Sequence, residues 1–301
     1  VQIAPQSVKQ IQKTESVMQR LREIAAKGFS PSALPSYIRN PLEFYFQKIL
    51  RLSEFEEVEE TVAANTLGTI IHDTLEKFYQ PLENSLLAVD DLVGMKNRVH
   101  DEVTAQFKKT FRGGTFSKGK NLIIFEVAKR YISNFIDREI AEVEAGNTIK
   151  IRKIETDLTL EIPIRELDFP VKIHGKVDRV DEYNGQLRII DYKTGLVNQG
   201  DVEIMDWEEL SKDYKFSKAF QVLTYALMMN KDLPIHGAEA GIISFKNLAS
   251  GFLKFGTKTS AYSKRDQQIT AETLETFTIE LKKLILEICD PQLPFTEKEI
   301  D

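Results

Sequence analysis

The sequence predicts a mixed α/β domain with a helical N-terminal part. Three observations lead to this class. Apolar residues recur at helical spacing through most of the first 145 positions, and they alternate with polar residues between about 154 and 193. A helix, a strand and a last helix follow. Helices, then a run of antiparallel strands, then mixed elements are typical of one α/β domain.

The composition supports a folded chain and excludes several classes. Of 301 residues, 42% are hydrophobic and 29% charged, which excludes a disordered or fibrous protein. The net charge of −6 offers no evidence for nucleic-acid binding, and the single Cys289 excludes a disulfide framework. No apolar run approaches the roughly 18 residues of a membrane helix. Because no signal peptide is visible either, we expect a cytoplasmic protein.

The helical part divides into several segments. Asn40 and Pro41 resemble an N-cap followed by a first-turn proline, so they open a helix. The apolar residues from Leu67 to Tyr79 recur at three and four, which indicates an amphipathic helix. The expected helices are an N-terminal one over 1–27, one over 42–50, one over 67–79 and two within 91–143.

The period changes after Gly146, where alternation indicates strands. The expected strands are 154–164, 171–181, 187–193 and 238–245, with helices over 216–230 and 270–288. In the first of these strands, Glu155 falls on the polar face and is expected to be exposed to solvent.

Asn184-Gly185 joins two alternating strands and is the strongest hairpin signal in the chain, because a type I′ turn needs positive φ at both positions. With these two residues as the loop, Asp178 lies directly opposite Asp191. Paired residues have Cβ atoms roughly 4.5–5.5 Å apart, and two like charges there are destabilising. A shared divalent cation would convert this repulsion into coordination, and oxygen ligands suit Mg²⁺ or Mn²⁺.

Lys193 is two residues after Asp191 and therefore projects from the same face, while Tyr192 points away. Its ammonium group can orient or deprotonate a water molecule and offset charge on a phosphate oxygen. An Asp-x-Lys pattern alone is most often a surface pair. The independent hairpin register is what favours a catalytic site.

Several segments carry motif residues in a fixed order. They are Pro31-Ser32-x-Leu34-x-x-Tyr37, Asn40-Pro41-x-x-Phe44-Tyr45, Gly68-Thr69-x-x-His72-x-x-x-Glu76, Gly175-x-x-Asp178-Arg179, Ile190-Asp191-Tyr192-Lys193-Thr194-Gly195 and Gln221-x-x-x-Tyr225. Together they resemble the PD-(D/E)XK nuclease superfamily, and within it the nuclease domain of RecB/AddB-type helicase–nucleases. The resemblance covers about residues 30 to 230.

The resemblance implies a restriction-endonuclease-like core, with a central mixed sheet that contains an antiparallel meander and is flanked by helices. The implied organisation is an N-terminal helix or linker (1–30) and a nuclease domain (31–301), which divides into a mainly helical part (31–145), a catalytic sheet and helix (146–250) and a C-terminal helix (268–290).

The resemblance also implies roles for individual residues. The metal ligands would be His72, Asp178, Asp191 and the backbone carbonyl of Tyr192, with Asp178, Asp191 and Lys193 forming the catalytic set. The substrate-binding residues would be Gln221, Tyr225 and Lys218, which share one helix face. The expected cofactor is Mg²⁺ or Mn²⁺.

These assignments have plainer alternatives. A lone histidine such as His72, beside an apolar stripe, is more often a core or boundary residue. Glu76 could orient His72 or could equally be a solvated partner of a nearby side chain. Gln221 and Tyr225 could mark only an amphipathic boundary.

Many relatives in this family have a cysteine at the position of Asn40 and three more after a segment like Pro294-Phe295-Thr296, which together hold an iron–sulfur cluster. Because position 40 is Asn, no iron–sulfur cluster is expected in this chain.

The expected function is a metal-dependent DNA nuclease, with exonuclease action favoured, that works in DNA recombination or repair. One alternative is a non-catalytic DNA-binding or scaffolding module. Another is a nuclease that works only with a helicase subunit or a helicase region of a longer parent chain. A basic cluster could track the DNA backbone, although a solvated loop explains it equally well; it consists of Lys108, Lys109, Arg112, Lys118 and Lys120.

Overall fold

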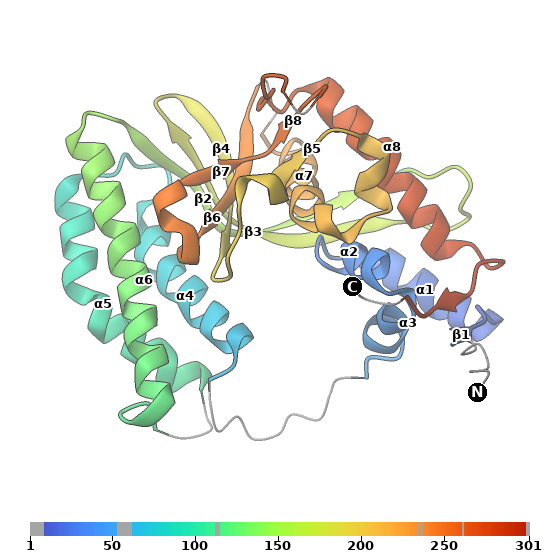
Figure 1. Ribbon diagram of the computed structural model, residues 1–301, viewed down its shortest axis with the longest axis horizontal. Coiled ribbons are helices and arrows are strands. Elements are labelled where there is room, and N and C mark those ends of the chain that lie inside the picture. Colours follow the sequence, from blue (N-terminus) through green and yellow to red (C-terminus); the bar gives the residue numbers. More distant parts are fainter. Residues whose placement is uncertain are drawn as a thin grey trace, which may run out of the picture.

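The computed structural model describes residues 9–52, 62–111, 115–233, 235, 237–260 and 262–298. A five-stranded sheet in the order β2-β3-β4-β6-β7 forms the centre (Figure 1). Its strands are β2 (Ile149–Glu161), β3 (Lys172–Tyr183), β4 (Gln186–Lys193), β6 (Glu239–Ser244) and β7 (Phe252–Lys254). The first three form an antiparallel meander, β6 runs parallel to β4, and β7 is antiparallel to β6. The predicted mixed α/β fold is therefore confirmed.

Helices cover both faces of this sheet (Figure 1). One face carries α4 (Ala64–Tyr79), α5 (Val89–Thr110) and α6 (Gly119–Glu144), and the other carries α1 (Glu15–Lys27), α2 (Ala33–Arg39), α3 (Pro41–Phe44), α7 (Ser217–Met229) and α8 (Ala271–Cys289). Ile190 and Tyr192 of β4 pack into the hydrophobic core between the sheet and helices α4, α5 and α6, whereas Ile189 packs into the core on the opposite face. Alternate residues of one strand thus serve different cores.

Short elements complete the chain. They are β1 (Gln10–Ile11), β5 (Glu203–Ile204), β8 (Gly256–Thr257), β9 (Phe295–Thr296), the π-helix η1 (Tyr45–Ile49) and the 3₁₀ helices η2 (Gln80–Leu82), η3 (Gln199–Val202), η4 (Trp207–Ser211), η5 (Tyr214–Phe216) and η6 (Phe245–Ser250). β1 pairs with β9, so the two ends of the described chain are joined in one small sheet. Among the described residues, none of the helices is sufficiently long and apolar to cross a membrane.

The N-terminal region differs from the prediction in detail. The expected helix over 1–27 begins only at Glu15, and residues 1–8 lie outside the described part. Asn40 caps a helix as predicted, because its Oδ1 accepts hydrogen bonds from the N–H groups of Leu42 and Glu43. That helix continues as the π-helix η1. Helix α2 is not among the helices expected from the sequence. Its Pro35 lies in the first turn, where no backbone N–H is needed.

Gly175 of β3 lets the N-terminal region pack against the sheet. A Cβ atom at this position would lie 2.6 Å from Cδ of Pro31, which is closer than two such atoms can approach. The glycine therefore creates the space for the proline ring. Two of the motifs noticed in the sequence are in direct contact here.

Candidate active site

The β3–β4 hairpin has the predicted turn and register. Asn184 and Gly185 have φ values of +50° and +83°, as a type I′ turn requires. The five pairs run from Tyr183 with Gln186 to Arg179 with Ile190, which is the register expected from the sequence. The next position of the same register places Asp178 opposite Asp191, just beyond the last paired residues.

The two strands remain connected at this position through a side chain. Asp178 Oδ2 accepts a hydrogen bond from the backbone N–H of Tyr192 at 2.6 Å. Asp178 and Asp191 are both buried. Burial raises the pKa of Asp191, and the neighbouring charge of Asp178 adds to this rise, while Lys193 opposes it. The repulsion between the two carboxylates that the sequence predicted is thus reflected in the pKa of Asp191.

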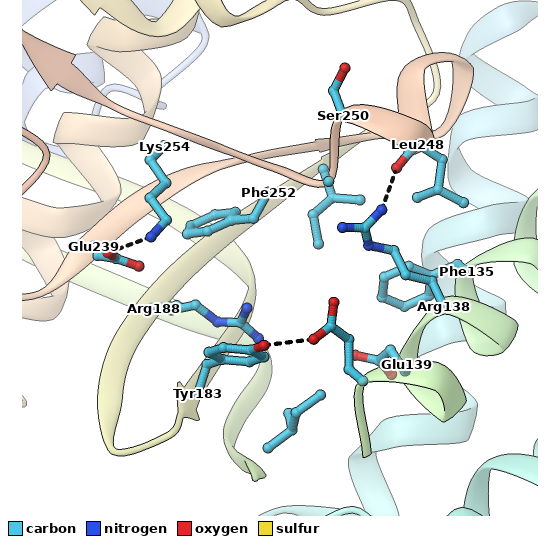
Figure 2. Close-up of a pocket in the computed structure, with 14 residues that line it drawn as sticks. Phe135, Arg138, Glu139, Tyr183, Arg188, Glu239, Leu248, Ser250, Phe252 and Lys254 are labelled. Carbon is cyan, nitrogen blue, oxygen red and sulfur yellow. Dashed lines mark hydrogen bonds and ion pairs between the residues drawn. The ribbon is translucent and has the colours of Figure 1, made fainter. Parts of the chain in front are cut away.

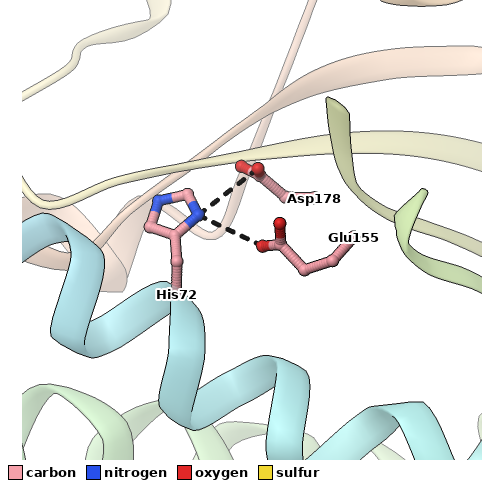
Figure 3. Close-up of side chains that lie close together, drawn as sticks. All are labelled: His72, Glu155 and Asp178. Atoms are coloured by element: carbon pink, nitrogen blue, oxygen red, sulfur yellow. Dashed lines mark hydrogen bonds and ion pairs between the residues drawn. The ribbon is translucent and has the colours of Figure 1, made fainter. Parts of the chain in front are cut away.

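His72 reaches the same place from α4. Its Nδ1 lies 3.3 Å from Asp178 Oδ1 and 3.3 Å from Glu155 Oε1 (Figure 3). Burial disfavours the protonated imidazole, but the two carboxylates outweigh it and raise the pKa of His72 to about 10. The two acids therefore favour the protonated form of the His72 imidazole.

Glu155 is the site residue that sequence reasoning missed. It was expected to be exposed to solvent, yet its side chain is only 8% exposed. The residues before and after it pair with Arg179 and Val177, so Glu155 stands opposite Asp178. Its φ of +45° is unusual for a residue other than glycine, and such strain is often found at functional sites.

A second contact holds the other oxygen of Glu155. Lys176 Nζ lies 3.1 Å from Glu155 Oε2 and 4.0 Å from Glu76 Oε2. The carboxylate beside His72 is therefore Glu155, whereas Glu76 lies near Lys176. The proposed orientation of His72 by Glu76 is replaced by a contact with Glu155.

His72, Glu155 and Asp178 form a group that fits a divalent cation. Each offers one ligand atom, and these atoms all lie within 4.8 Å of one another. One imidazole nitrogen and carboxylate oxygens are a suitable donor set for Mn²⁺ and, through the oxygens, for Mg²⁺. Asp191 stands beside this group rather than within it.

Asp191 instead contacts a lysine and a helix. Lys193 Nζ lies 2.5 Å from Asp191 Oδ2. Gln221 of α7 donates from Nε2 to Asp191 Oδ1 at 3.3 Å and to the hydroxyl of Tyr225 at 3.1 Å. The sequence-predicted residues of β4 and α7 are therefore brought together around this carboxylate.

Lys218, in the first turn of α7, is a second positive charge near Lys193; these two lysines form the positive side of the site. Burial lowers its pKa, and the charge of Lys193 lowers it further, whereas Asp191 opposes the change. Burial likewise raises the pKa of Tyr225. The role of the Tyr192 carbonyl as a metal ligand stays a prediction, since the recorded contact at this residue is made by its N–H.

The basic cluster begins next to the helix that carries His72. Lys109 Nζ, near the end of α5, lies 2.7 Å from Asp73 Oδ2. Arg112 lies outside the described residues. The remaining members are exposed, namely Lys108, Lys118 and Lys120. Part of the cluster is thus available to solvent.

The chain is similar to several longer proteins. An uncharacterized protein of Rickettsia bellii is 23% identical over 282 residues, which cover 87% of this chain and 30% of that protein. Uncharacterized proteins of Rickettsia typhi and Rickettsia conorii are 23% and 25% identical over 177 residues, which cover 56% of this chain and 18% and 19% of theirs. The chain therefore spans less than a third of the length of these relatives.

One family comparison covers nearly the whole described fold. The model of the PD-(D/E)XK nuclease superfamily matches residues 28–299. This range includes the hairpin with its two aspartates and lysine, the histidine of α4 and the polar face of α7. Because this match covers more than half of the sequence, the chain belongs to the PD-(D/E)XK nuclease superfamily.

Proposed function

We propose that the protein is a metal-dependent DNA nuclease that hydrolyses phosphodiester bonds, with exonuclease action, in DNA recombination or repair. The observation that carries this proposal is one arrangement of side chains. A cation-binding group formed by His72, Glu155 and Asp178 stands next to Asp191 and its paired Lys193. Family membership supports the reaction class, and the RecB/AddB-like order of motifs supports the substrate.

The chain supplies different groups for different parts of the reaction. His72, Glu155 and Asp178 would hold Mg²⁺ or Mn²⁺, with Asp191 and the Tyr192 carbonyl as further oxygen donors. The ion would supply Lewis acidity for the phosphate and for a water molecule. Lys193 would orient or deprotonate the attacking water, or offset the charge that develops on a phosphate oxygen. Asp191 holds the Lys193 ammonium in position for this task.

Substrate binding would use the positive side of the site. Lys218 is partly buried beside Lys193, so its charge would be available to a phosphate at short range. Gln221 and Tyr225 would support Asp191 and contact the substrate backbone. The exposed lysines around the end of α5 would attract the DNA backbone over a longer distance, despite the acidic total charge.

The proposal is tested with linear DNA that carries a label on either end, incubated with Mg²⁺. We expect release of labelled nucleotides from one end and little cleavage of a circular duplex. Asp191→Ala and Lys193→Ala should each abolish the release, with folding monitored by circular dichroism. Degradation that persists in both variants would overturn the mechanism.

A second form of the proposal takes account of chain length. The relatives are much longer than this chain, which favours action within a longer parent protein or with a helicase partner. That form predicts weak digestion by the isolated chain, so robust processive digestion would count against it. A chain that binds neither Mn²⁺ nor Mg²⁺ by calorimetry would instead be a DNA-binding or scaffolding module.

A further inference from the structure

The reverse side of the catalytic hairpin contains a buried charged group that the reaction does not use. Side chains alternate along a strand, so the residue after each catalytic aspartate points to the opposite face. After Asp178 comes Arg179, and after Asp191 comes Tyr192. Arg179 is fully buried and Tyr192 nearly so.

Arg179 and Tyr192 meet on that face. Arg179 Nη1 donates to the Tyr192 hydroxyl at 3.4 Å. Arg179 Nη2 also lies 2.7 Å from Asp181 Oδ2 and 2.8 Å from Glu139 Oε1 of α6. The two strands are therefore linked just behind the position where their backbone pairing ends.

The same guanidinium reaches the helix that carries His72. The ring of Tyr79 lies over the guanidinium of Arg179, 5.0 Å from its carbon, and the Tyr79 hydroxyl donates to Glu139. Tyr79 follows His72 by about two helical turns on α4. One buried cation thus contacts side chains from α4, β3 and β4, the elements that provide His72, Asp178 and Asp191.

A buried charge of this kind needs a reason beyond stability. Replacement of a buried ion pair by apolar residues of similar volume is often neutral or stabilising. Apolar packing has no preferred direction. Hydrogen bonds and ion pairs do, so they fix the relative position of the groups that they join. Outer partners of metal sites act in this way when they hold the ligands in place.

We propose that Arg179 is a positioning residue, whose contacts with Tyr192, Glu139, Asp181 and the ring of Tyr79 set the spacing of His72 on α4, Asp178 on β3 and Asp191 on β4. The proposal rests on the proposed function, in that it takes His72 and Asp178 as ligands of a divalent cation, with Asp191 as a further oxygen donor. It adds a residue that touches neither the cation nor the substrate.

The test compares Mn²⁺ affinity, measured by calorimetry without DNA, with the melting temperature of the same variants. Arg179→Lys keeps the positive charge but loses the planar guanidinium, whose several N–H groups contact different partners at once. We expect its Mn²⁺ affinity to fall about 10- to 100-fold, the usual effect of an outer partner. High Mn²⁺ concentration should restore the DNA cleavage of this variant. Because Mn²⁺ also stabilises any folded state that it binds, the melting temperature is measured without the metal, and it should show that the variant is folded before the ion is added.

Two milder variants keep the test decisive if Arg179→Lys folds poorly. Tyr192→Phe and Tyr79→Phe each remove only a hydroxyl group from this network. We expect both to weaken Mn²⁺ binding several-fold. Their melting temperatures should change little.

Arg188 provides a matched control. Its guanidinium binds the same Asp181, through Nε at 2.7 Å and Nη2 at 2.8 Å. It lies over the Tyr183 ring and lines a cavity of about 280 Å³, where Figure 2 shows it beside Phe252. Its recorded partners among the described residues are Asp181, Tyr183 and Phe252, none of which belongs to α4 or is Tyr192. Arg188→Lys should therefore leave Mn²⁺ affinity unchanged.

The outcomes separate this inference from the proposed function. Unchanged Mn²⁺ affinity in Arg179→Lys, or in both hydroxyl variants if that protein does not fold, would overturn the positioning role. Equal losses in Arg179→Lys and Arg188→Lys would do the same. A wild-type chain that binds Mn²⁺ but cleaves no DNA would overturn the function alone, whereas one that binds no Mn²⁺ would overturn both.

Discussion

The two aspartates that face each other across the hairpin lie in different halves of the site. Asp178 belongs to a ligand half, with His72 and Glu155. Asp191 belongs to a lysine half, with Lys193 and Gln221. The first half gathers one side chain each from α4, β2 and β3, whereas the second uses β4 and α7.

The difference between these halves indicates that each is suited to a different task. In the ligand half, two acids raise the pKa of a histidine, so the group as a whole attracts a cation. In the lysine half, burial raises the pKa of Asp191, and the paired ammonium compensates for the missing solvent. The first half is suited to metal binding, and the second to proton transfer and phosphate charge.

The largest expected effect comes from comparing Mn²⁺ binding with DNA cleavage in variants of the two halves. Lys193→Ala should lower the single-turnover rate of DNA cleavage by about 10²–10⁴-fold, the usual contribution of a positioned acid or base. Its Mn²⁺ affinity should stay near that of the wild type, while Asp178→Asn should lose both properties. If Lys193→Ala lost Mn²⁺ affinity as fully as Asp178→Asn, the two halves would act as one.

Glu155→Gln tests whether the residue missed by the sequence belongs to the ligand half. The change keeps shape and removes one negative charge from the group. Mn²⁺ affinity should fall about tenfold or more, since even supporting partners of metal sites contribute that much. Glu76→Gln is the control, because the ion pair of Glu76 is with Lys176, at 4.0 Å, whereas the ion pairs of His72 among the described residues are with Glu155 and Asp178. An equal effect of both changes would argue against Glu155 as a ligand.

The raised pKa of His72 predicts proton release on metal binding. With a pKa of about 10, the imidazole is protonated at pH 7.5, and ligation requires the neutral form. Calorimetry of Mn²⁺ binding in two buffers with different ionisation enthalpies should therefore report release of roughly one proton per ion. His72→Gln should release clearly less. A wild-type value near zero would place His72 outside the ligand set.

The smallest expected effect concerns stability without metal. The folded pKa of His72, about 10, lies above the unfolded value of 6.5, so its contribution is complete below pH 6.5. That contribution is lost as the pH rises through 10. Urea unfolding between pH 6 and pH 10 should show a wild-type advantage over His72→Gln that shrinks as the pH rises. A constant difference would mean that the imidazole is neutral throughout.

The pairing of Asp191 with Lys193 in the lysine half could be predicted from the sequence because its geometry is local. A two-residue turn fixes the register of β3 and β4, and strand alternation then places Lys193 beside Asp191. The order of helical and alternating segments likewise gave the mixed sheet. Each of these inferences depends on neighbours that are close in the chain.

The ligand half could not be predicted in the same way. No tight turn fixes the register between β2 and β3, whose pairing shifts between Ile151 and Lys153. Glu155 also has a positive φ, which alternation does not anticipate. The approach of His72 depends on how α4 packs, and the pairing of β1 with β9 joins segments from opposite ends of the chain.

The contact between Gly175 and Pro31 affects any attempt to transplant this chemistry. The hairpin with its aspartates and lysine is short and has its own turn, so it invites grafting onto another scaffold. Yet Gly175 of β3 has no side chain, and the ring of Pro31 occupies the space that a side chain would take. A host that lacks this partner would leave a hole beside the transferred strand, so the donor piece should include the proline turn from the outset.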